Sequence, residues 1–141
     1  MAGLSSNMLF TRHLRIISLL LAFAWMGIIF YLSGLPDIKL PGVEPGFDKL
    51  YHAGAYGLLA VLYMGAMQPG ERGYRPVQVL TATLLAGLYG LSDEWHQSFV
   101  PSRMPDVWDL VADVTGALVA TAGTAIALRQ LGKRAESVSS S

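Results

Sequence analysis

The charged residues of this chain are spaced so that they leave four apolar windows between them. The windows span residues 16–35, 50–68, 76–92 and 114–128. A helix needs about 20 apolar residues to cross the hydrocarbon core of a bilayer, which is about 30 Å thick. The spacing therefore predicts an all-α membrane protein, folded as a compact bundle of four transmembrane helices. Small residues in the later windows, such as Gly57 and Gly116, favour close packing of these helices.

Composition excludes several classes of protein and of site. Of the 141 residues, 52% are hydrophobic and 14% are charged, whereas a soluble domain is about 25% charged. The chain contains no cysteine, which excludes disulfide bonds, thiolate metal sites and cysteine nucleophiles. Ten basic and ten acidic residues give a net charge of zero, so the field that attracts nucleic acid is absent. We expect membrane lipids as partners and no nucleic acid.

The lysine and arginine residues predict how the bundle is oriented. Seven of them flank the termini and the second connection, against three beside the first and third connections, namely Lys39, Lys49 and Arg103. The positive-inside rule then places both termini in the cytoplasm. The predicted organisation is a flexible amino-terminal tail over residues 1–13, a multi-pass domain over 14–130 and a disordered tail over 131–141.

A polar stripe begins the second window, on the side predicted to face outward. Lys49, His52 and Tyr56 follow spacings of three and four residues, so they project from one face of a helix. An alternative interpretation is purely interfacial. In it Asp48 caps the helix, Lys49 extends its ammonium group to water, and the two rings lie in the membrane interface.

The third window ends in two adjacent carboxylates, Asp93 and Glu94. They lie in the last turns of a helix that Pro101 must end at or before Val100. Because the carboxyl end of a helix is the negative end of its dipole, carboxylates there need a compensating partner. Arg103 is the nearest candidate along the chain.

The fourth window is too short to cross a membrane, because its 15 residues cover only about 22 Å as a helix. The span is therefore expected to begin near Asp106, which draws Asp109 and Asp113 into the membrane. Asp106 is well placed to cap the helix. A charged carboxylate deep in a span costs about 2.5 to 3.5 kcal/mol. We therefore expect Asp113 to face the bundle interior and to find a partner or a proton.

The outward polar set carries an excess of negative charge, with two bases, Lys49 and Arg103, against six acids: Asp48, Asp93, Glu94, Asp106, Asp109 and Asp113. This excess argues against a simple phosphate pocket, and either protonated carboxylates or a divalent metal ion as cofactor would balance it. The candidate ligands of such an ion are His52, Glu94 and Asp109. His52 and Glu94 are also the candidate catalytic acid and base. The candidate substrate-binding residues are Lys49, Tyr56, Asp93, Gln97, Arg103, Asp109 and Asp113.

Three motif blocks, in this order, resemble the VanZ-like family. They are Asp48-Lys49-x-x-His52-x-x-x-Tyr56, Asp93-Glu94-x-x-Gln97-x-Phe99-Val100-Pro101-x-Arg103, and Asp106-x-x-Asp109 leading to Asp113 and Gly116. The resemblance covers residues 16–128. One position departs from it, because many relatives carry Asn where this chain has Asp113. That departure implies a hydrogen-bonding role, with a protonated carboxyl group here.

The resemblance implies a small multi-helix protein of the bacterial cytoplasmic (inner) membrane. The founding member of the family is associated with low-level resistance to the glycopeptide teicoplanin. Two functional hypotheses follow. In the first, the polar set binds or modifies an amphipathic, lipid-linked cell-envelope substrate. In the second, the chain is a non-catalytic membrane scaffold or a lipid- or drug-binding protein, and its polar residues form a structural network. A bundle this small would also gain buried surface by forming a homo-oligomer.

Overall fold

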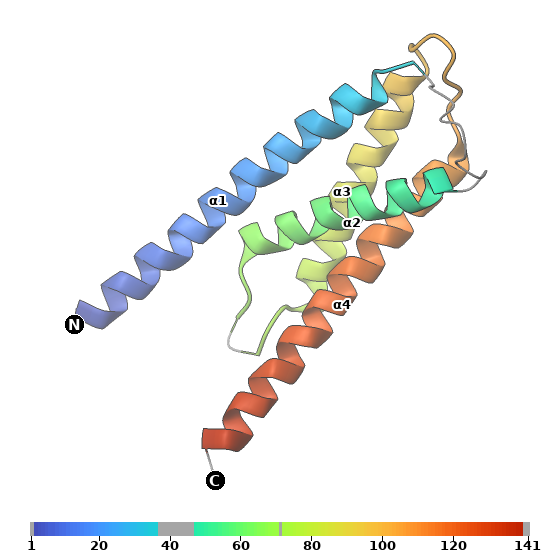
Figure 1. The fold of residues 1–141 in the computed structure, drawn as a ribbon. Helices are drawn as coiled ribbons and strands as arrows, with labels where there is room; N and C mark the ends of the chain where they lie inside the picture. The colour runs from blue at the N-terminus through green and yellow to red at the C-terminus, as the bar shows by residue number, and fades with distance from the viewer. Residues whose placement is uncertain (1, 37–46, 71, 140–141) are drawn as a thin grey trace.

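The computed structural model describes residues 2–36, 47–70 and 72–139, which form four helices and no strand. The helices are α1 (Ala2–Ser33), α2 (Phe47–Met67), α3 (Pro76–Gln97) and α4 (Val107–Ser139). Consecutive helices run in opposite directions, so both ends of the chain lie at one end of the bundle (Figure 1). We call this the terminal end. The opposite end, where α1 and α3 finish and α2 and α4 begin, is the loop end. The predicted all-α bundle is confirmed.

Three helical stretches are long and apolar enough to cross a membrane, by length and composition: Phe10–Ser33, Phe47–Met67 and Val107–Val138. The third helix, α3, falls short of the same measure because polar residues interrupt its apolar run near both ends, Gln78 at one and Asp93 and Glu94 at the other. Three membrane-type helices are thus established. Crossing by α3 and the orientation of the bundle stay predictions, and Lys39, one of the residues behind that orientation, lies outside the described part of the chain.

The helix boundaries agree with the sequence at the loop end and differ at the terminal end. Helix α3 ends at Gln97, before Pro101, and α4 begins at Val107, as the length of the fourth window required. At the terminal end, α1 extends back to Ala2 and α4 continues to Ser139, through segments for which the sequence predicted irregular tails. Neither segment contains a proline, and a single glycine such as Gly132 does not end a helix that has good helix-forming neighbours.

The closest helix crossing joins α2 to α4 through glycine. A Cβ atom added to Gly57 would lie 3.1 Å from the carbonyl oxygen of Gly116, and one added to Gly116 would overlap the backbone of Ala53. Next to this crossing, Ala60 of α2 and Ala117 of α4 are fully buried with Ala86 of α3. The predicted packing through small residues is confirmed. It brings the backbones of α2 and α4 close together just below the loop end.

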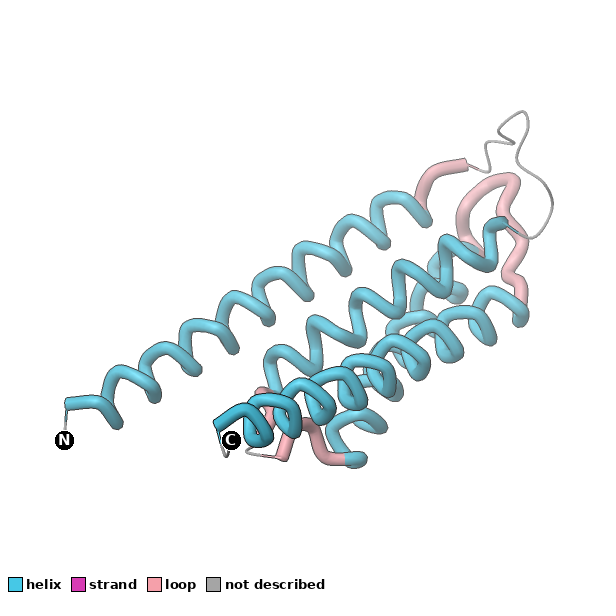
Figure 2. The backbone as a smooth tube through the Cα atoms, turned by 60° about the horizontal axis from the view of Figure 1, so that its bottom comes forward, coloured by secondary structure: helices cyan, strands magenta, loops and turns pink. Residues whose placement is uncertain are grey.

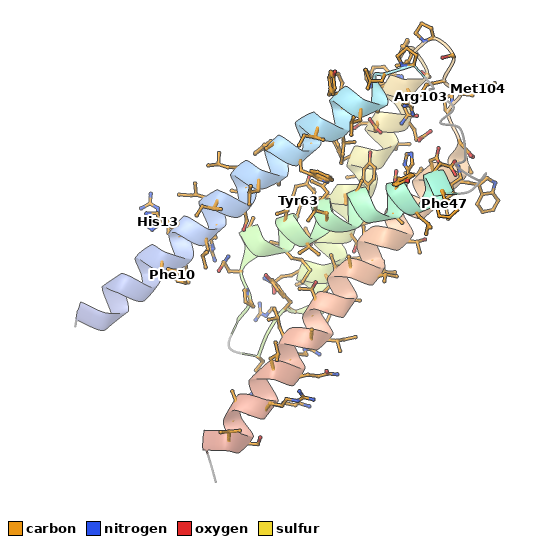
Figure 3. All side chains as sticks on the ribbon, viewed as in Figure 1. Phe10, His13, Phe47, Tyr63, Arg103 and Met104 are labelled. Atoms are coloured by element: carbon orange, nitrogen blue, oxygen red, sulfur yellow. The ribbon has the colours of Figure 1, made fainter. Side chains whose placement is uncertain are left out.

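Helix α1 lies along one side of the other three helices (Figure 2). It is attached to α2 by the indole of Trp25, whose Nε1 donates a hydrogen bond to the carbonyl oxygen of Ala55 at 2.9 Å. Large apolar side chains project outward from the bundle, among them Phe10 and Phe47, which are labelled in Figure 3. Such a surface suits contact with lipid tails, which solvate apolar side chains as well as a protein interior does.

Candidate functional site

Polar side chains from α2, α3 and α4 gather at the loop end, where the bundle buries several of them. The central contact joins His52 of α2 to Asp113 of α4, with Nδ1 of the imidazole 2.9 Å from Oδ1 of the carboxyl group. Asp113 is only 1% exposed. The prediction that Asp113 faces the interior and finds a partner is therefore confirmed. When Asp113 is ionised, its carboxylate accepts a hydrogen bond from Nδ1–H, and Nε2 of His52 is then the nitrogen with a free lone pair.

Lys49, one turn before His52, is surrounded by carboxylates. Its Nζ lies 3.1 Å from Asp48 and 2.6 Å from Asp106, and it also forms an ion pair and a hydrogen bond with Asp109. These contacts tie the start of α2 to the start of α4. The sequence suggested Lys49 as a substrate-binding residue, whereas in the structure its charge is paired with protein carboxylates.

Asp106 caps α4, as predicted. Its Oδ1 accepts the backbone N–H of Trp108 at 2.9 Å, which satisfies one of the free donors at the start of the helix. Its other oxygen accepts from Lys49. The hydrogen bond from Lys49 and the one from Trp108 together hold the pKa of Asp106 below its ordinary value.

Glu94 of α3 is buried against the start of α4, with 7% of the residue exposed. Its Oε2 accepts the backbone N–H of Asp106 at 2.9 Å. Its Oε1 is buried and has no hydrogen-bond partner within the described residues. The neighbouring carboxylate, Asp93, accepts a hydrogen bond from Gln97 at 3.1 Å through Oδ2, and its Oδ1 is likewise buried without a partner there.

Arg103 is not the partner of Asp93 or Glu94 that the sequence suggested. Its Nε donates to the carbonyl oxygen of Leu35 at 2.9 Å, and Nη2 donates to that of Leu32 at 3.3 Å. The physical reason is the end of α1, where the last carbonyl groups of the helix have no partner within it and attract a nearby cation. Arg103 thereby fixes the loop after α3 to the end of α1, as its position in Figure 3 indicates.

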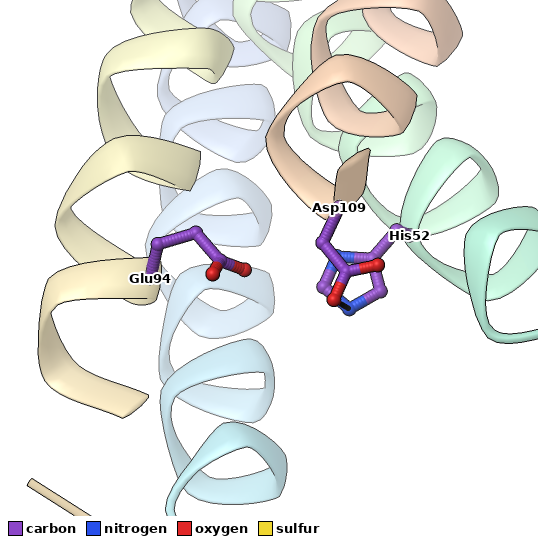
Figure 4. Close-up of side chains that lie close together, drawn as sticks. All are labelled: His52, Glu94 and Asp109. Carbon is purple, nitrogen blue, oxygen red and sulfur yellow. Dashed lines mark ion pairs between the residues drawn. The ribbon is translucent and has the colours of Figure 1, made fainter. Parts of the chain in front are cut away.

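Three potential metal ligands converge between α2, α3 and α4. One ligand atom from each of His52, Glu94 and Asp109 lies within 4.8 Å of the other two, and Figure 4 shows the carboxyl group of Glu94 directed toward the other two side chains. Nε2 of His52 is 3.8 Å from Oδ2 of Asp109. These are the three residues that the sequence suggested for a metal ion.

A cavity of about 270 Å³ lies between α1, α2 and α3, and His52 is part of its lining. Its polar lining includes His52, Tyr56, Asp93, Gln97 and Arg103. Because binding sites for whole drug-sized ligands measure roughly 300 to 1,000 Å³, this cavity suits one polar group of a larger molecule. The hydroxyl group of Tyr56 is buried there without a hydrogen-bond partner in the described residues. The cavity therefore offers polar groups that a bound molecule could satisfy.

The nine site residues predicted from the sequence all lie at the loop end, in two groups that meet at His52. Tyr56, Asp93, Gln97 and Arg103 line the cavity, while Lys49, Glu94, Asp109 and Asp113 form the cluster of charged side chains around His52. Sequence reasoning missed the contribution of α1. Ser33 lines the cavity, and its Oγ lies 3.3 Å from Nδ1 of His96, whose ring stacks on Phe30. The only signal was a serine at the end of an apolar run, which is too common to single out.

The comparison with family models identifies VanZ/LLP1, with residues 4–128 matched. No curated protein and no solved structure matches the chain at a significant level. The matched range includes α2, α3 and all nine predicted site residues.

Proposed function

The chain belongs to the VanZ/LLP1 family, and we propose that it binds the polar headgroup of an amphipathic, lipid-linked cell-envelope molecule at its loop end and modifies it. In this proposal His52 moves a proton to or from the reacting group. The protein acts in the bacterial cytoplasmic membrane, with its loop end at the outer face.

The position of His52 carries the proposal. Its ring lines the cavity, while its Nδ1 is held 2.9 Å from the buried carboxyl group of Asp113. A histidine whose ring is oriented in this way is suited to general acid or base catalysis, because an imidazole can both accept and donate a proton. Two of the helices that line the cavity, α1 and α2, are long and apolar enough to cross a membrane, so a bound molecule could leave its apolar chain in the lipid.

Arg103 is the cation best placed to recognise an anionic headgroup. It lines the cavity, and its two hydrogen bonds to carbonyl groups at and just after the end of α1 leave other N–H groups of the guanidinium available. Lys49 is engaged by three carboxylates and serves the cluster instead. The outward orientation is supported by the terminal end, where the positive-inside rule favours the cytoplasm for Arg129, Lys133 and Arg134.

Native mass spectrometry of the protein released from mild detergent tests the binding part of the proposal. We expect the wild type to carry a lipid-linked molecule and Arg103→Gln to lose it. Arg75→Gln is the matched control, because it removes the same charge at the terminal end and should keep the lipid. A wild type without bound lipid, or equal occupancy in the two variants, would contradict the proposed headgroup site.

A susceptibility assay tests the catalytic part. If the glycopeptide link of the family extends to this chain, expression in a teicoplanin-susceptible bacterium should raise the inhibitory concentration of the drug. His52→Gln, inserted at the same level, should abolish the increase while still carrying the lipid. Full protection by that variant would remove His52 from the chemistry.

The second candidate function is a non-catalytic scaffold or a lipid- or drug-binding protein. It is favoured by the contacts that join helices at the loop end, such as Lys49 with Asp106 and Glu94 with the start of α4. Under this alternative, each site variant should lose stability in proportion to its loss of function. Under the proposal above, His52→Gln loses function at nearly unchanged stability.

A further inference from the structure

We propose that His52, Glu94 and Asp109 bind one divalent transition-metal ion, of the class of Mn²⁺ or Zn²⁺. The ligand atoms are Nε2 of His52, Oε1 of Glu94 and Oδ2 of Asp109. The inference rests on the headgroup site of the proposed function and gives His52 a different role there. A ring whose Nε2 binds an ion and whose Nδ1 is held by Asp113 has no nitrogen left to move a proton. The test needs no substrate.

Each of the three side chains has one polar atom held by the protein and a second that remains for a ligand. Nδ1 of His52 is bound to Asp113, Oε2 of Glu94 to the N–H of Asp106, and Oδ1 of Asp109 to Lys49. One ligand atom from each residue falls within 4.8 Å of the others. Two ligands about 2.2 Å from one ion are at most about 4.4 Å apart, so binding an ion requires only small movements of these side chains. The protein partners thus orient all three candidate ligands toward one point.

Glu94 supplies an independent observation. The residue is 7% exposed, and its Oε1 is buried without a hydrogen-bond partner among the described residues. That carboxyl group is directed toward His52 and Asp109 in Figure 4. Leaving a buried carboxylate oxygen without a partner is unfavourable, and a cation at this point would satisfy it.

The charge balance of the loop end favours a cation as well. The three carboxylates around Lys49 outnumber its single positive charge, and Glu94 and Asp113 add to the excess. A divalent ion would offset two of these negative charges. The competing explanation is a proton on Glu94, which the experiment below distinguishes from a metal.

The donor set indicates the class of metal. One imidazole nitrogen and two carboxylate oxygens suit Mn²⁺, Fe²⁺ or Zn²⁺, whereas Ca²⁺ prefers oxygen ligands alone and Cu(I) prefers sulfur. Three protein ligands leave coordination positions for water or for a substrate oxygen. Asp113 and Lys49 are positioning residues, because they orient His52 and Asp109 by hydrogen bonds to their other atoms.

The test is a titration of the full-length protein in detergent micelles with MnCl₂, after EDTA treatment and removal of the EDTA. Free Mn²⁺ is measured by its electron paramagnetic resonance signal. We expect the wild type to take up one Mn²⁺ per chain. Glu94→Gln and Asp109→Asn should each weaken binding at least about 100-fold, and Asp113→Asn about 10-fold, which is the scale of effects expected for a residue that orients a ligand.

Asp48→Asn is the matched control, because this carboxylate contacts Lys49 but is exposed and is not one of the three ligands. It should bind Mn²⁺ within about threefold of the wild type, since exposed charge pairs contribute little. Mn²⁺ should also raise the melting temperature of the wild type and leave that of Glu94→Gln unchanged.

The proposal is overturned if the wild type takes up no stoichiometric Mn²⁺ or Zn²⁺, or if Glu94→Gln and Asp109→Asn bind it as the wild type does. If the wild type takes up no metal and Glu94→Gln is as stable as the wild type, the carboxyl group of Glu94 is protonated instead. Lipid retained in the Arg103 experiment would then leave the proposed function standing without a metal ion. Stoichiometric metal with no bound lipid would support the metal site and contradict the proposed headgroup site.

Discussion

The two ends of the bundle carry similar numbers of charged residues but differ in how deeply those residues are buried. At the loop end, Asp113 is 1% exposed and is paired with a histidine of another helix. At the terminal end, Lys133 and Arg134 of the same α4 are exposed. The 33 residues of α4 exceed the 21 of α2, so its last turns extend beyond the end of α2 (Figure 1). Burial of a charge on α4 therefore depends on whether another helix backbone approaches it closely.

The glycine crossing should produce the largest effect, because it creates that close approach. Gly116→Ala would place a methyl group on the backbone of Ala53, and the helices would have to move apart. We expect the free energy of unfolding to fall by about 3 kcal/mol, at the upper end of effects seen for overpacking. Reversible unfolding by sodium dodecyl sulfate in mixed micelles measures the change.

Gly123→Ala on the same helix is the control, because nothing lies within 4 Å of the added methyl group. It should stay within about 1 kcal/mol of the wild type, since alanine favours the helix. Equal stability of the two alanine variants would show that α2 and α4 do not approach each other closely at Gly116.

Two lysines test the difference between the ends directly. Lys49→Met removes the cation that joins Asp48, Asp106 and Asp109 and leaves their charges close together. Because the Lys49 side chain is 30% exposed, we expect a loss of about 2 kcal/mol, below the roughly 3 to 5 kcal/mol of a fully buried pair. The same unfolding assay applies.

Lys133→Met at the terminal end should change stability by less than about 0.5 kcal/mol, because the residue is exposed. Equal losses in the two methionine variants would show that the loop-end charges are as well solvated as the terminal ones. Charges at the two ends would then contribute equally to the stability of the fold.

Asp113 separates charge from hydrogen bonding in the buried pair. Asp113→Ala leaves Nδ1 of His52 without its partner, and we expect it to lower stability by about 2 kcal/mol. Asp113→Asn retains an oxygen that can accept from Nδ1, so its loss should stay below about 1 kcal/mol. Unfolding measurements at pH 7 on both variants decide the point. An asparagine variant as unstable as the alanine variant would mean that the negative charge itself is required.

How far the sequence predicted this site depended on the range of the interaction. Asp106 and Asp113 could be assigned correctly because a helix cap and a buried carboxylate follow from spacing along one helix and from the cost of charge in lipid. Arg103 could not be assigned, because its partners are carbonyl groups in the last turn of α1 and just after it, distant in the sequence, and every helix end offers such groups.

The convergence of His52, Glu94 and Asp109 lies between these cases. Composition and spacing named the three residues as candidate ligands, but only the packing of three helices brings their atoms within 4.8 Å. The ends of α1 and α4 illustrate the opposite limit, because nothing in their local sequence marks where a helix stops.

The smallest expected effect concerns Asp106, which lies at the exposed edge of the loop-end cluster. Its pKa in the folded protein lies below the ordinary value of 3.8, because it accepts hydrogen bonds from Lys49 and from the backbone of Trp108. A carboxylate with a depressed folded-state pKa stabilises the fold above its unfolded-state pKa and loses that contribution as pH falls through the folded-state value. Asp106→Asn keeps a good helix cap and removes only the charge.

The wild type should therefore be more stable than Asp106→Asn by a constant margin from pH 5 to pH 7, and the margin should shrink below about pH 4. Arg134→Gln at the terminal end provides the comparison, because an arginine does not titrate in this range and its margin should stay flat. A margin for Asp106→Asn that is equally flat would mean that the Lys49 contact adds nothing at the rim, and that the stabilising electrostatics of the loop end are confined to the buried groups around His52.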